Sequence, residues 1–506
     1  MLGSNVTRWT ALVAMLSLTG GCHALLPLSA APGDGTGASE ATPPVDASGD
    51  ATRDQTIQDA DVKLPAGDAG GEAVRHDLGS GAVAWLKCFG AGANDRAYAV
   101  AVDGSDNVYV TGHFANTVDF GGGPRTSTTG GTGDVFVASY TAAGTHRWSS
   151  TFGGAGADHG MALAINGSGG VYLAGVHTGD FSVGSESVTL QGASDVLLAS
   201  LDGVGKVQWL RGYGGPGSDR ADGIAADMAG NIYIAGSFSD SVDLGGKSLT
   251  SKGLSDAFVA SYAAASGTLR WALGFGDLKA DAAYAIAVDG SGNSSATGYF
   301  QGTTSLGGPP RTAAATDAFV LALDPQGKYR WDATLGGQLY EYGRGVTLDG
   351  AGNVYVAGSF AGSGSFAGTQ LTASGADVFV ASFNAAGGGR WATGFGGASS
   401  DVAQAVGLGP AGVVVTGYFG QSVTLGTDTL LDKGGNDVLV AALDGSGAPV
   451  RGWALGGGQA DSGEAVAVDS TGNIYVAGYL RGTVSFGQAG SCSAVGEDAF
   501  LAKIVP

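Results

Sequence analysis

The 506-residue sequence has few basic residues, with 24 Lys and Arg against 45 Asp and Glu. The net charge of −21 argues against a nucleic-acid backbone or an anionic lipid surface as the main partner, because both would repel the chain. Proline is also sparse, at 13 residues, and the 94 glycines follow no regular spacing, which excludes a collagen-like chain. The glycines instead separate regular apolar runs, which indicates a turn-rich β protein.

An aspartate returns at an almost fixed interval, and each copy begins a short apolar run such as DVFVASY or DAFLAKI. Consecutive copies are 60 or 61 residues apart. These third-strand aspartates are Asp134, Asp195, Asp256, Asp317, Asp377, Asp437 and Asp498. Self-similarity at one period predicts a repeat architecture, and all-β units of this length predict a seven-bladed β-propeller over residues 79–506.

Each unit contains four strand-like runs, which are clearest between residues 341 and 395. The second and third runs are apolar at both parities, as expected for strands that neighbouring sheets cover on both faces. Turns such as DGSDN at 103–107 and DGAGN at 349–353 join the first two runs. Asp, Asn and Gly favour tight hairpin turns, so we interpret these segments as structural turns rather than as calcium loops.

The fourth run of each unit carries a tryptophan. The series is Trp85, Trp148, Trp209, Trp271, Trp331, Trp391 and Trp453. An arginine directly precedes the tryptophan in four units, as Arg147, Arg270, Arg330 and Arg390. A cation on an outermost strand hinders pairing with another molecule, so we interpret these arginines as edge protection.

The N-terminus has the parts of an export signal, with Arg8 as the positive end and an apolar stretch from Trp9 to Leu18. That stretch is too short to span a bilayer as a permanent helix. Small residues then precede Cys22, a pattern that resembles the lipobox of bacterial lipoproteins. The alternative is an ordinary secretory signal.

The lipobox resemblance implies that residues 1–21 are removed and that Cys22 is lipidated. The protein is then expected in the cell envelope, at the outer membrane, attached by its lipid anchor alone. Residues 22–78 are rich in Ala, Gly, Asp and Pro and have few aromatics. We expect a flexible acidic linker there, because such a composition cannot bury a core.

The last unit ends after its third strand, whereas an unpartnered fourth-strand sequence, GAVAWLKCFG, stands at 81–90. We therefore expect the N-terminal strand to complete the seventh blade, so that no open edge remains. Cys88 and Cys492 both fall in that blade, near one face. With Cys22 assigned to lipid, these two are predicted to form a disulfide in an exported protein.

The units resemble the SBBP β-propeller repeats of bacterial exported and surface proteins, through the run FGGAGADHGMALAINGSGGVYLAG at 152–175 and its relatives. The resemblance covers about residues 80–506. It implies a propeller in a cell-envelope setting. It implies no catalytic residues, because the family carries no single established activity.

A second acidic series precedes the first strand of each unit, five residues after a glycine. The corner acids are Asp95, Asp158, Asp219, Asp281, Glu341, Asp401 and Asp461. Both acidic series are expected on one face of the propeller. Each acid is expected to accept backbone N–H bonds and fix its own loop, since every blade needs the same corner. The competing interpretation is a channel mouth that attracts cations, with calcium as the candidate ion.

Signals for an enzyme are poor, because the six histidines all lie in the first 177 residues and have no metal-ligand spacing. We expect a monomeric, non-catalytic binding or scaffolding module for a protein or glycan at the cell surface, without a cofactor. The alternatives are a metal-assisted enzyme acting on polysaccharide and an outer-membrane assembly scaffold. Deviations between blades mark the places to search, namely Tyr340 with Tyr342, His113 with His177, and the loop at Pro309 and Pro310.

Overall fold

The computed structural model describes residues 83–90, 92–128, 133–166 and 169–506. These residues form antiparallel β-sheets and one short 3-10 helix, η1 (Gly487–Ala489). Within the same ranges, no helix is long and apolar enough to cross a membrane. The predicted signal peptide, Cys22 and the linker over 22–78 lie outside the described residues.

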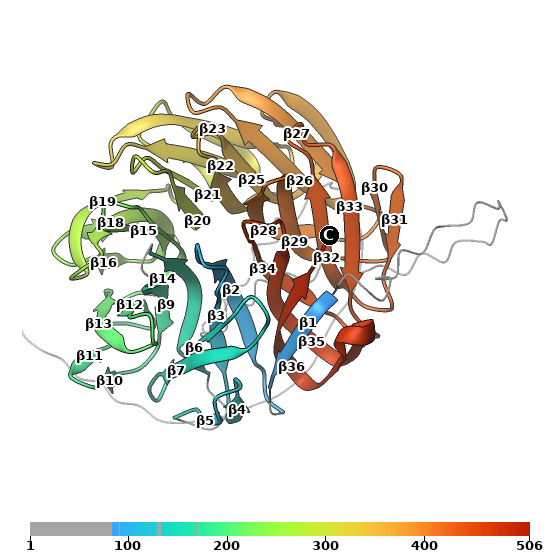
Figure 1. Ribbon diagram of the computed structural model, residues 1–506. Coiled ribbons are helices and arrows are strands. Elements are labelled where there is room, and N and C mark those ends of the chain that lie inside the picture. The colour runs from blue at the N-terminus through green and yellow to red at the C-terminus, as the bar shows by residue number, and fades with distance from the viewer. Residues whose placement is uncertain (1–82, 91, 129–132, 167–168) are drawn as a thin grey trace, which may run out of the picture. The chain divides into compact units, whose positions relative to one another are not determined.

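Most of the described chain folds into four-stranded sheets with the strand order expected for propeller blades (Figure 1). The first sheet contains β2 (Arg96–Val102), β3 (Val108–Phe114), β6 (Asp134–Tyr140) and β7 (His146–Phe152). The second contains β8 (His159–Ile165), β9 (Val171–His177), β12 (Asp195–Leu201) and β13 (Val207–Tyr213). The third contains β14 (Asp219–Ala226), β15 (Asn231–Phe238), β18 (Asp256–Ala263) and β19 (Thr268–Phe275).

The next eight strands form one continuous sheet made of two four-stranded halves. The first half contains β20 (Ala282–Val288), β21 (Ser294–Thr304), β22 (Arg311–Leu323) and β23 (Tyr329–Gly337). The second contains β24 (Glu341–Leu348), β25 (Val354–Phe366), β26 (Thr369–Phe383) and β27 (Gly389–Phe395). A short pairing joins the halves, with Gly336 and Gly337 of β23 opposite Ser365 and Gly364 of β25.

Two further four-stranded sheets complete the described chain. One contains β28 (Val402–Gly409), β29 (Gly412–Phe419), β32 (Asp437–Leu443) and β33 (Pro449–Leu455). The other contains β34 (Ser462–Val468), β35 (Ile474–Ser485), β36 (Ser491–Ile504) and the N-terminal strand β1 (Val83–Phe89).

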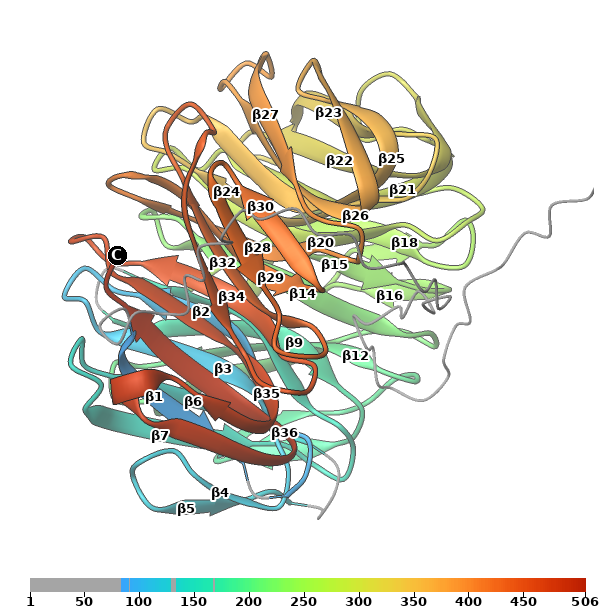
Figure 2. The same cartoon turned by 90° about the vertical axis from the view of Figure 1, so that its right-hand side faces the viewer.

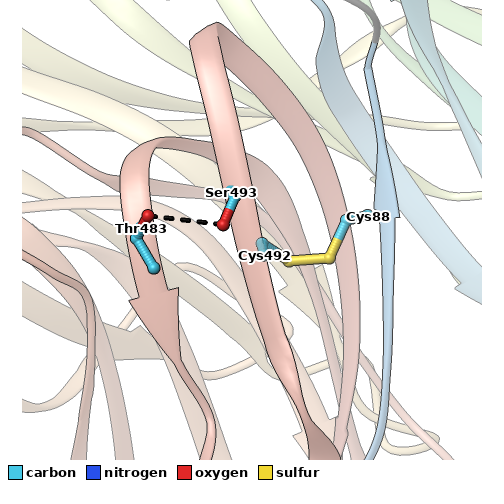
Figure 3. The surroundings of a disulfide bond; sticks show 4 residues. All are labelled: Cys88, Thr483, Cys492 and Ser493. Atoms are coloured by element: carbon cyan, nitrogen blue, oxygen red, sulfur yellow. Dashed lines mark hydrogen bonds between the residues drawn. A yellow bond between two sulfur atoms is a disulfide. The ribbon is translucent and has the colours of Figure 1, made fainter.

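The last sheet joins the two ends of the described chain, because β1 pairs antiparallel with β36 (Figures 1 and 2). The predicted Cys88–Cys492 disulfide is present and links these two strands over a sequence separation of 404 residues, with their Cα atoms 5.9 Å apart. Figure 3 shows this bond beside the Thr483–Ser493 hydrogen bond of the β35–β36 hairpin. The N-terminal strand thus completes the C-terminal sheet.

The sequence analysis did not predict the outer hairpins that extend each sheet between its second and third strands. Four of them are separate two-stranded sheets: β4 (Thr117–Asp119) with β5 (Pro124–Thr126), β10 (Phe181–Val183) with β11 (Glu186–Val188), β16 (Ser241–Asp243) with β17 (Ser248–Thr250), and β30 (Ser422–Leu425) with β31 (Asp428–Leu431). In the other sheets the long strands β21–β22, β25–β26 and β35–β36 continue into the hairpin.

The first strands of the sheets are the innermost ones, and each contacts the next around a common centre (Figure 1). The contacts run from β2 through β8, β14, β20, β24 and β28 to β34, and β34 contacts β2. Small residues permit this close approach. A Cβ on Gly223 of β14, for example, would lie 2.9 Å from the Cα of Ala285 on β20.

The hydrophobic core lies between neighbouring sheets. One cluster combines Phe136 of the first sheet with Phe89, Tyr475 and Leu501 of the last. All four side chains are buried. Each sheet is therefore covered on both faces, as the apolar pattern of the second and third strands predicted.

Candidate functional site

The corner acids are buried at the start of each first strand, and six of the seven, all except Asp219, accept hydrogen bonds from backbone N–H groups of the described residues. Asp401 accepts from the N–H of Gly397 at 2.6 Å and from the N–H of Gly420 at 3.2 Å. Asp158, Asp281 and Asp461 repeat both bonds with the equivalent residues. Each carboxylate thereby joins the loop before its strand to the end of the second strand of the same sheet.

The third-strand aspartates lie beside the corner acids, with the preceding glycine between them. A Cβ on Gly153 would lie 2.7 Å from the carboxyl carbon of Asp134 and 2.8 Å from Oδ2 of Asp158. The same crowding recurs at Gly276, Gly336 and Gly396. The structure therefore brings the two acidic series together in pairs, and the glycine five residues before each corner acid leaves room for both carboxylates.

Burial raises the pKa of these paired acids. The pKa of Asp401 rises to about 7, because burial and the nearby Asp377 outweigh the two N–H donors. The pKa of Asp437 also rises to about 7, through burial and the charge of Asp461. Neutral carboxyls are favoured at such sites, because two buried like charges repel.

The aspartates of the hairpin turns show the opposite behaviour. Burial opposes ionisation of Asp469, but hydrogen bonds from Asn473, Thr471 and Tyr475 lower its pKa to about 2. Asp103 and Asp349 also accept hydrogen bonds from the Asn and the Tyr at the equivalent positions of their turns, but they have no donor equivalent to the Thr471 side chain. Their pKa values are also lowered. These residues hold the turn, as predicted. Among the described residues, no group of three or more His, Cys, Asp or Glu side chains is arranged to hold a metal ion.

Every first strand contains a β-bulge at the third residue after its corner acid. At Arg344, for example, the pairing with β25 skips from Gly343 to Gly345. These seven residues, here termed the bulge ring, are Tyr98, Met161, Asp222, Tyr284, Arg344, Gln404 and Glu464. A bulge re-aims a side chain, and the residue differs in type at nearly every position. The bulge ring therefore breaks the symmetry that the corner acids keep.

The arginines of the first strands differ in their partners. Arg96 forms an ion pair with Glu497 of β36, which also binds Arg481. Arg220 donates to Asp222 at 3.0 Å. Both cations therefore have a carboxylate partner beside them.

Arg344 has aromatic neighbours instead. Its guanidinium carbon lies 5.8 Å from the ring centre of Tyr284 and 5.6 Å from that of Tyr342. Within the described part of the chain it forms no ion pair. Its buried Nε has no hydrogen-bond partner there either. Arg344 and Tyr284 are also the two half-buried members of the bulge ring, whereas the other five are buried.

The histidine pair proposed from the sequence was wrong in one partner. His113 stacks on His159 of the next sheet, with ring centres 4.3 Å apart, and Tyr98 packs against both. His177 instead contacts Phe181 of its own hairpin. In the first sheet, His113 of β3 lies opposite Arg96 of β2. In the second sheet, the residue equivalent to His113 is Val176, which lies opposite His159 of β8. His177 is one residue further along β9, and its side chain therefore points to the opposite face of the sheet.

Of the other proposed places, only Tyr342 contacts the bulge ring, through Arg344. Tyr340 is 54% exposed, whereas Tyr342 is half-buried beside Tyr299, with ring centres 5.3 Å apart. Pro309 and Pro310 lie in the outer hairpin between β21 and β22. Of these residues, only Tyr342 belongs with the inner strands.

The tryptophans of the fourth strands connect successive sheets, a role that the sequence analysis missed. The indole N–H of Trp209 donates to the backbone oxygen of Ala264 in the next sheet at 2.9 Å. Trp85, Trp148, Trp271, Trp331 and Trp391 make the equivalent bond. The buried Nε1 of Trp453 has no partner among the described residues. The other tryptophans bond to the turn between the third and fourth strands of the next sheet, and in the last sheet those two strands, β36 and β1, are not consecutive in the sequence.

The arginines before the tryptophans also have partners within the fold. Arg147 donates to Tyr109 Oη and Ser139 Oγ, and Arg390 makes the same pair of bonds to Tyr355 and Ser382. These side chains therefore brace their own sheets. Edge protection alone does not describe them.

Comparison with solved structures finds β-propellers and related folds at low identity. The chain is similar to quinohemoprotein alcohol dehydrogenase from Comamonas testosteroni (13% identity, 77% of this chain and 74% of that chain covered, TM-score 0.37). It is also similar to the Pan2 WD40 domain of Neurospora crassa (9% identity, 80% of this chain and 88% of that chain covered, TM-score 0.39). A third similar structure is that of an ulvan lyase, a polysaccharide lyase (12% identity, 78% of this chain and 93% of that chain covered, TM-score 0.39). Likenesses this distant say nothing of what the chain binds.

No curated protein matches the chain. The sequence model of the SBBP β-propeller repeat matches residues 455–479, which run from the end of β33 through β34 into β35. This segment includes the corner acid Asp461, the turn at Asp469 and the bulge at Glu464. The protein has a β-propeller fold and carries the SBBP β-propeller repeat.

Proposed function

We propose that the chain is a closed seven-bladed β-propeller whose N-terminal strand completes the seventh blade. The sevenfold return of the corner acids and the succession of contacts from β2 to β34 and back to β2 support this architecture. The two halves of the eight-stranded sheet then count as two blades, since each has its own corner acid and its own bulge. The Cys88–Cys492 bond links β1 to β36, the first and last strands of the described chain.

We further propose that this propeller is a non-catalytic binding module whose ligand site is the bulge ring. One observation carries the proposal: the bulge of every inner strand bears a side chain of a different type, with tyrosine alone occurring twice, while the residues on both sides of the bulge are always Ala or Gly. Repetition serves the architecture that all blades share, whereas recognition of an asymmetric ligand needs different groups at each position. A protein or a glycan at the cell surface is the proposed ligand class.

The setting proposed for this module is the cell envelope. Cys22 would carry the lipid, residues 22–78 would act as the tether, and the monomeric propeller would be displayed at the outer membrane. Labelling of cells with an alkyne-bearing palmitate analogue tests this part, because the wild-type chain should be labelled and the Cys22→Ser variant should not. Labelling of neither protein, or equal labelling of both, would contradict lipidation at Cys22.

Binding is tested with the full chain, purified in detergent with its own N-terminus, on a panel of glycans and solubilised envelope proteins. A variant carrying Tyr98→Ala, Tyr284→Ala and Gln404→Ala should lose the binding seen for the wild type. The control variant carries Met228→Ala and Leu278→Ala, which remove large side chains that are 89% and 78% exposed. Equal binding by all three proteins, or turnover of a panel member by the wild type, would contradict the proposal.

A further inference from the structure

We propose that Arg344, with Tyr284 and Gln404 on either side of it in the bulge ring, binds the carboxylate of an acidic saccharide. This inference rests on the proposed function and names the ligand class for the same site. The three residues occupy equivalent bulges on β20, β24 and β28, and β24 contacts both of its neighbours. They therefore form one continuous arc of the ring.

The first reason is the missing partner of Arg344. Arg96 and Arg220 are other arginines of the inner strands, each directly after its corner acid and two residues before the bulge, and each has a carboxylate within hydrogen-bond distance. Arg344 is half-buried, forms no ion pair among the described residues and leaves its Nε unused. A buried Nε–H group is stabilised by an acceptor, and a carboxylate matches the planar donors of a guanidinium in a bidentate geometry.

The second reason is the tyrosine cluster that holds the guanidinium. Tyr284 and Tyr342 lie against Arg344, and Tyr299 packs against both rings at 5.6 and 5.3 Å. Tyrosine presents an apolar ring together with a hydroxyl, which suits a ligand with apolar ring faces and many hydroxyl groups. Such cation–π contacts also fix the direction in which the guanidinium points before a ligand arrives.

The third reason is an unused acceptor on the other side of Arg344. Gln404 is 4% exposed, and its Oε1 is buried without a hydrogen-bond partner among the described residues. An unused donor and an unused acceptor at adjacent positions match a ligand that carries both an anion and hydroxyl donors. A uronic acid supplies both on one sugar ring.

The flanking acids favour a singly charged ligand group. Asp222 precedes Tyr284 in the ring, and Glu464 follows Gln404. Both are buried, at 3% and 5% exposed. A phosphate dianion would meet stronger repulsion from these carboxylates than a uronate would, so a carboxylate fits the arc better.

The experiment compares trigalacturonate with galactotriose, two trisaccharides that differ in their C6 carboxylates, by isothermal titration calorimetry on the full chain. The wild type should bind trigalacturonate at least about 10-fold more tightly than galactotriose. Arg344→Gln should weaken the binding of trigalacturonate at least about 10-fold relative to the wild type. The affinity of Arg344→Lys should lie between those of the wild type and Arg344→Gln, because lysine keeps the charge but not the planar, two-pronged donor geometry of arginine. Arg451→Gln is the matched control, since Arg451 is an exposed arginine on β33 that lies over Trp453.

A second variant guards against an effect of folding. Gln404→Glu places an acid beside Arg344. It should weaken the binding of trigalacturonate while leaving the thermal midpoint near that of the wild type. Equal affinity for the two trisaccharides, no binding of trigalacturonate, or tighter binding of a glutamate-rich peptide would overturn the saccharide inference. If the triple bulge-ring variant still loses a partner found on the panel, the proposed function survives that failure. If no partner depends on the bulge ring, both fail.

Discussion

The corner acids and the bulge ring lie only three residues apart on every inner strand, yet they differ in almost every respect. Six of the seven corner acids are aspartates, all seven are buried, and six accept hydrogen bonds from nearby backbone N–H groups. The bulge ring carries aromatic, aliphatic, amide, acidic and basic side chains. One set is explained by the fold that contains it. For the other, a role in binding a ligand is what we propose.

The pH dependence of stability separates the two sets most strongly, because every sheet contributes to it. The pKa values raised to about 6 or 7 belong to Asp219, Asp281, Asp317, Glu341, Asp401, Asp437, Asp461 and Asp498. These folded-state values lie above the unfolded ones, so the stabilisation is fully present below about pH 4 and is lost as the pH rises through 6 to 7. The thermal midpoint should therefore fall by several degrees between pH 5 and pH 8.

General charge repulsion in this acidic chain acts in the same direction, and salt distinguishes the two causes. Repulsion between exposed charges is screened in about 0.5 M NaCl, whereas repulsion within a buried pair is screened much less. The fall should persist in salt and should shrink in the variant carrying Asp401→Asn and Asp437→Asn. A midpoint that rises from pH 5 to pH 8 would contradict the account of the corners.

Truncation of a single corner acid should lower the stability of the protein nearly as much as the rise in pH does. Asp401→Ala leaves the N–H groups of Gly397 and Gly420 buried without an acceptor, at a cost of about 2–4 kcal/mol in the free energy of unfolding. Urea denaturation of the full chain measures it. Asp401→Asn keeps one acceptor oxygen and should cost less. Equal stability of the alanine variant and the wild type would show that the corner bonds do not hold the sheet.

The tryptophan contacts give a smaller and well-matched comparison. Trp209→Phe and Trp453→Phe remove similar volumes from positions that are 5% and 3% exposed. Only the first breaks a bond, from its indole N–H to Ala264. Trp209→Phe should therefore cost about 1 kcal/mol more than Trp453→Phe in urea denaturation. The reverse order would contradict the role assigned to the tryptophans.

Much of the fold could be predicted because its signals are local. The 60- or 61-residue period, the Asp–Gly–Asn turns and the displaced N-terminal strand are patterns along the chain, and they led to the sheets, to the pairing of β1 with β36 and to the Cys88–Cys492 bond. The glycine before each corner acid was also visible. Its reason, room for two carboxylates, needed the packing of two strands.

The candidate site could not be predicted in the same way, because it depends on contacts between repeats. An alternating strand does not reveal a bulge, so the residue at Arg344 looked like one variable position among many. The partner of His113 was missed because a shift of one residue moves His177 to the other face of its strand. The signal that could have found the site is variation at the third residue after the corner acid, where the neighbouring residues are always Ala or Gly.

The central claim is that the corners hold the structure while the bulge ring is kept for binding. The thermal midpoint of Arg344→Gln, measured beside that of Asp401→Ala, tests it most directly. Removal of a half-buried cation without an acidic partner should leave the midpoint unchanged or raise it slightly, because residues kept for function are seldom those that stabilise the fold. The midpoint of Asp401→Ala should fall by several degrees. A loss in Arg344→Gln as large as that in Asp401→Ala would show that Arg344 is a structural residue and would contradict the account.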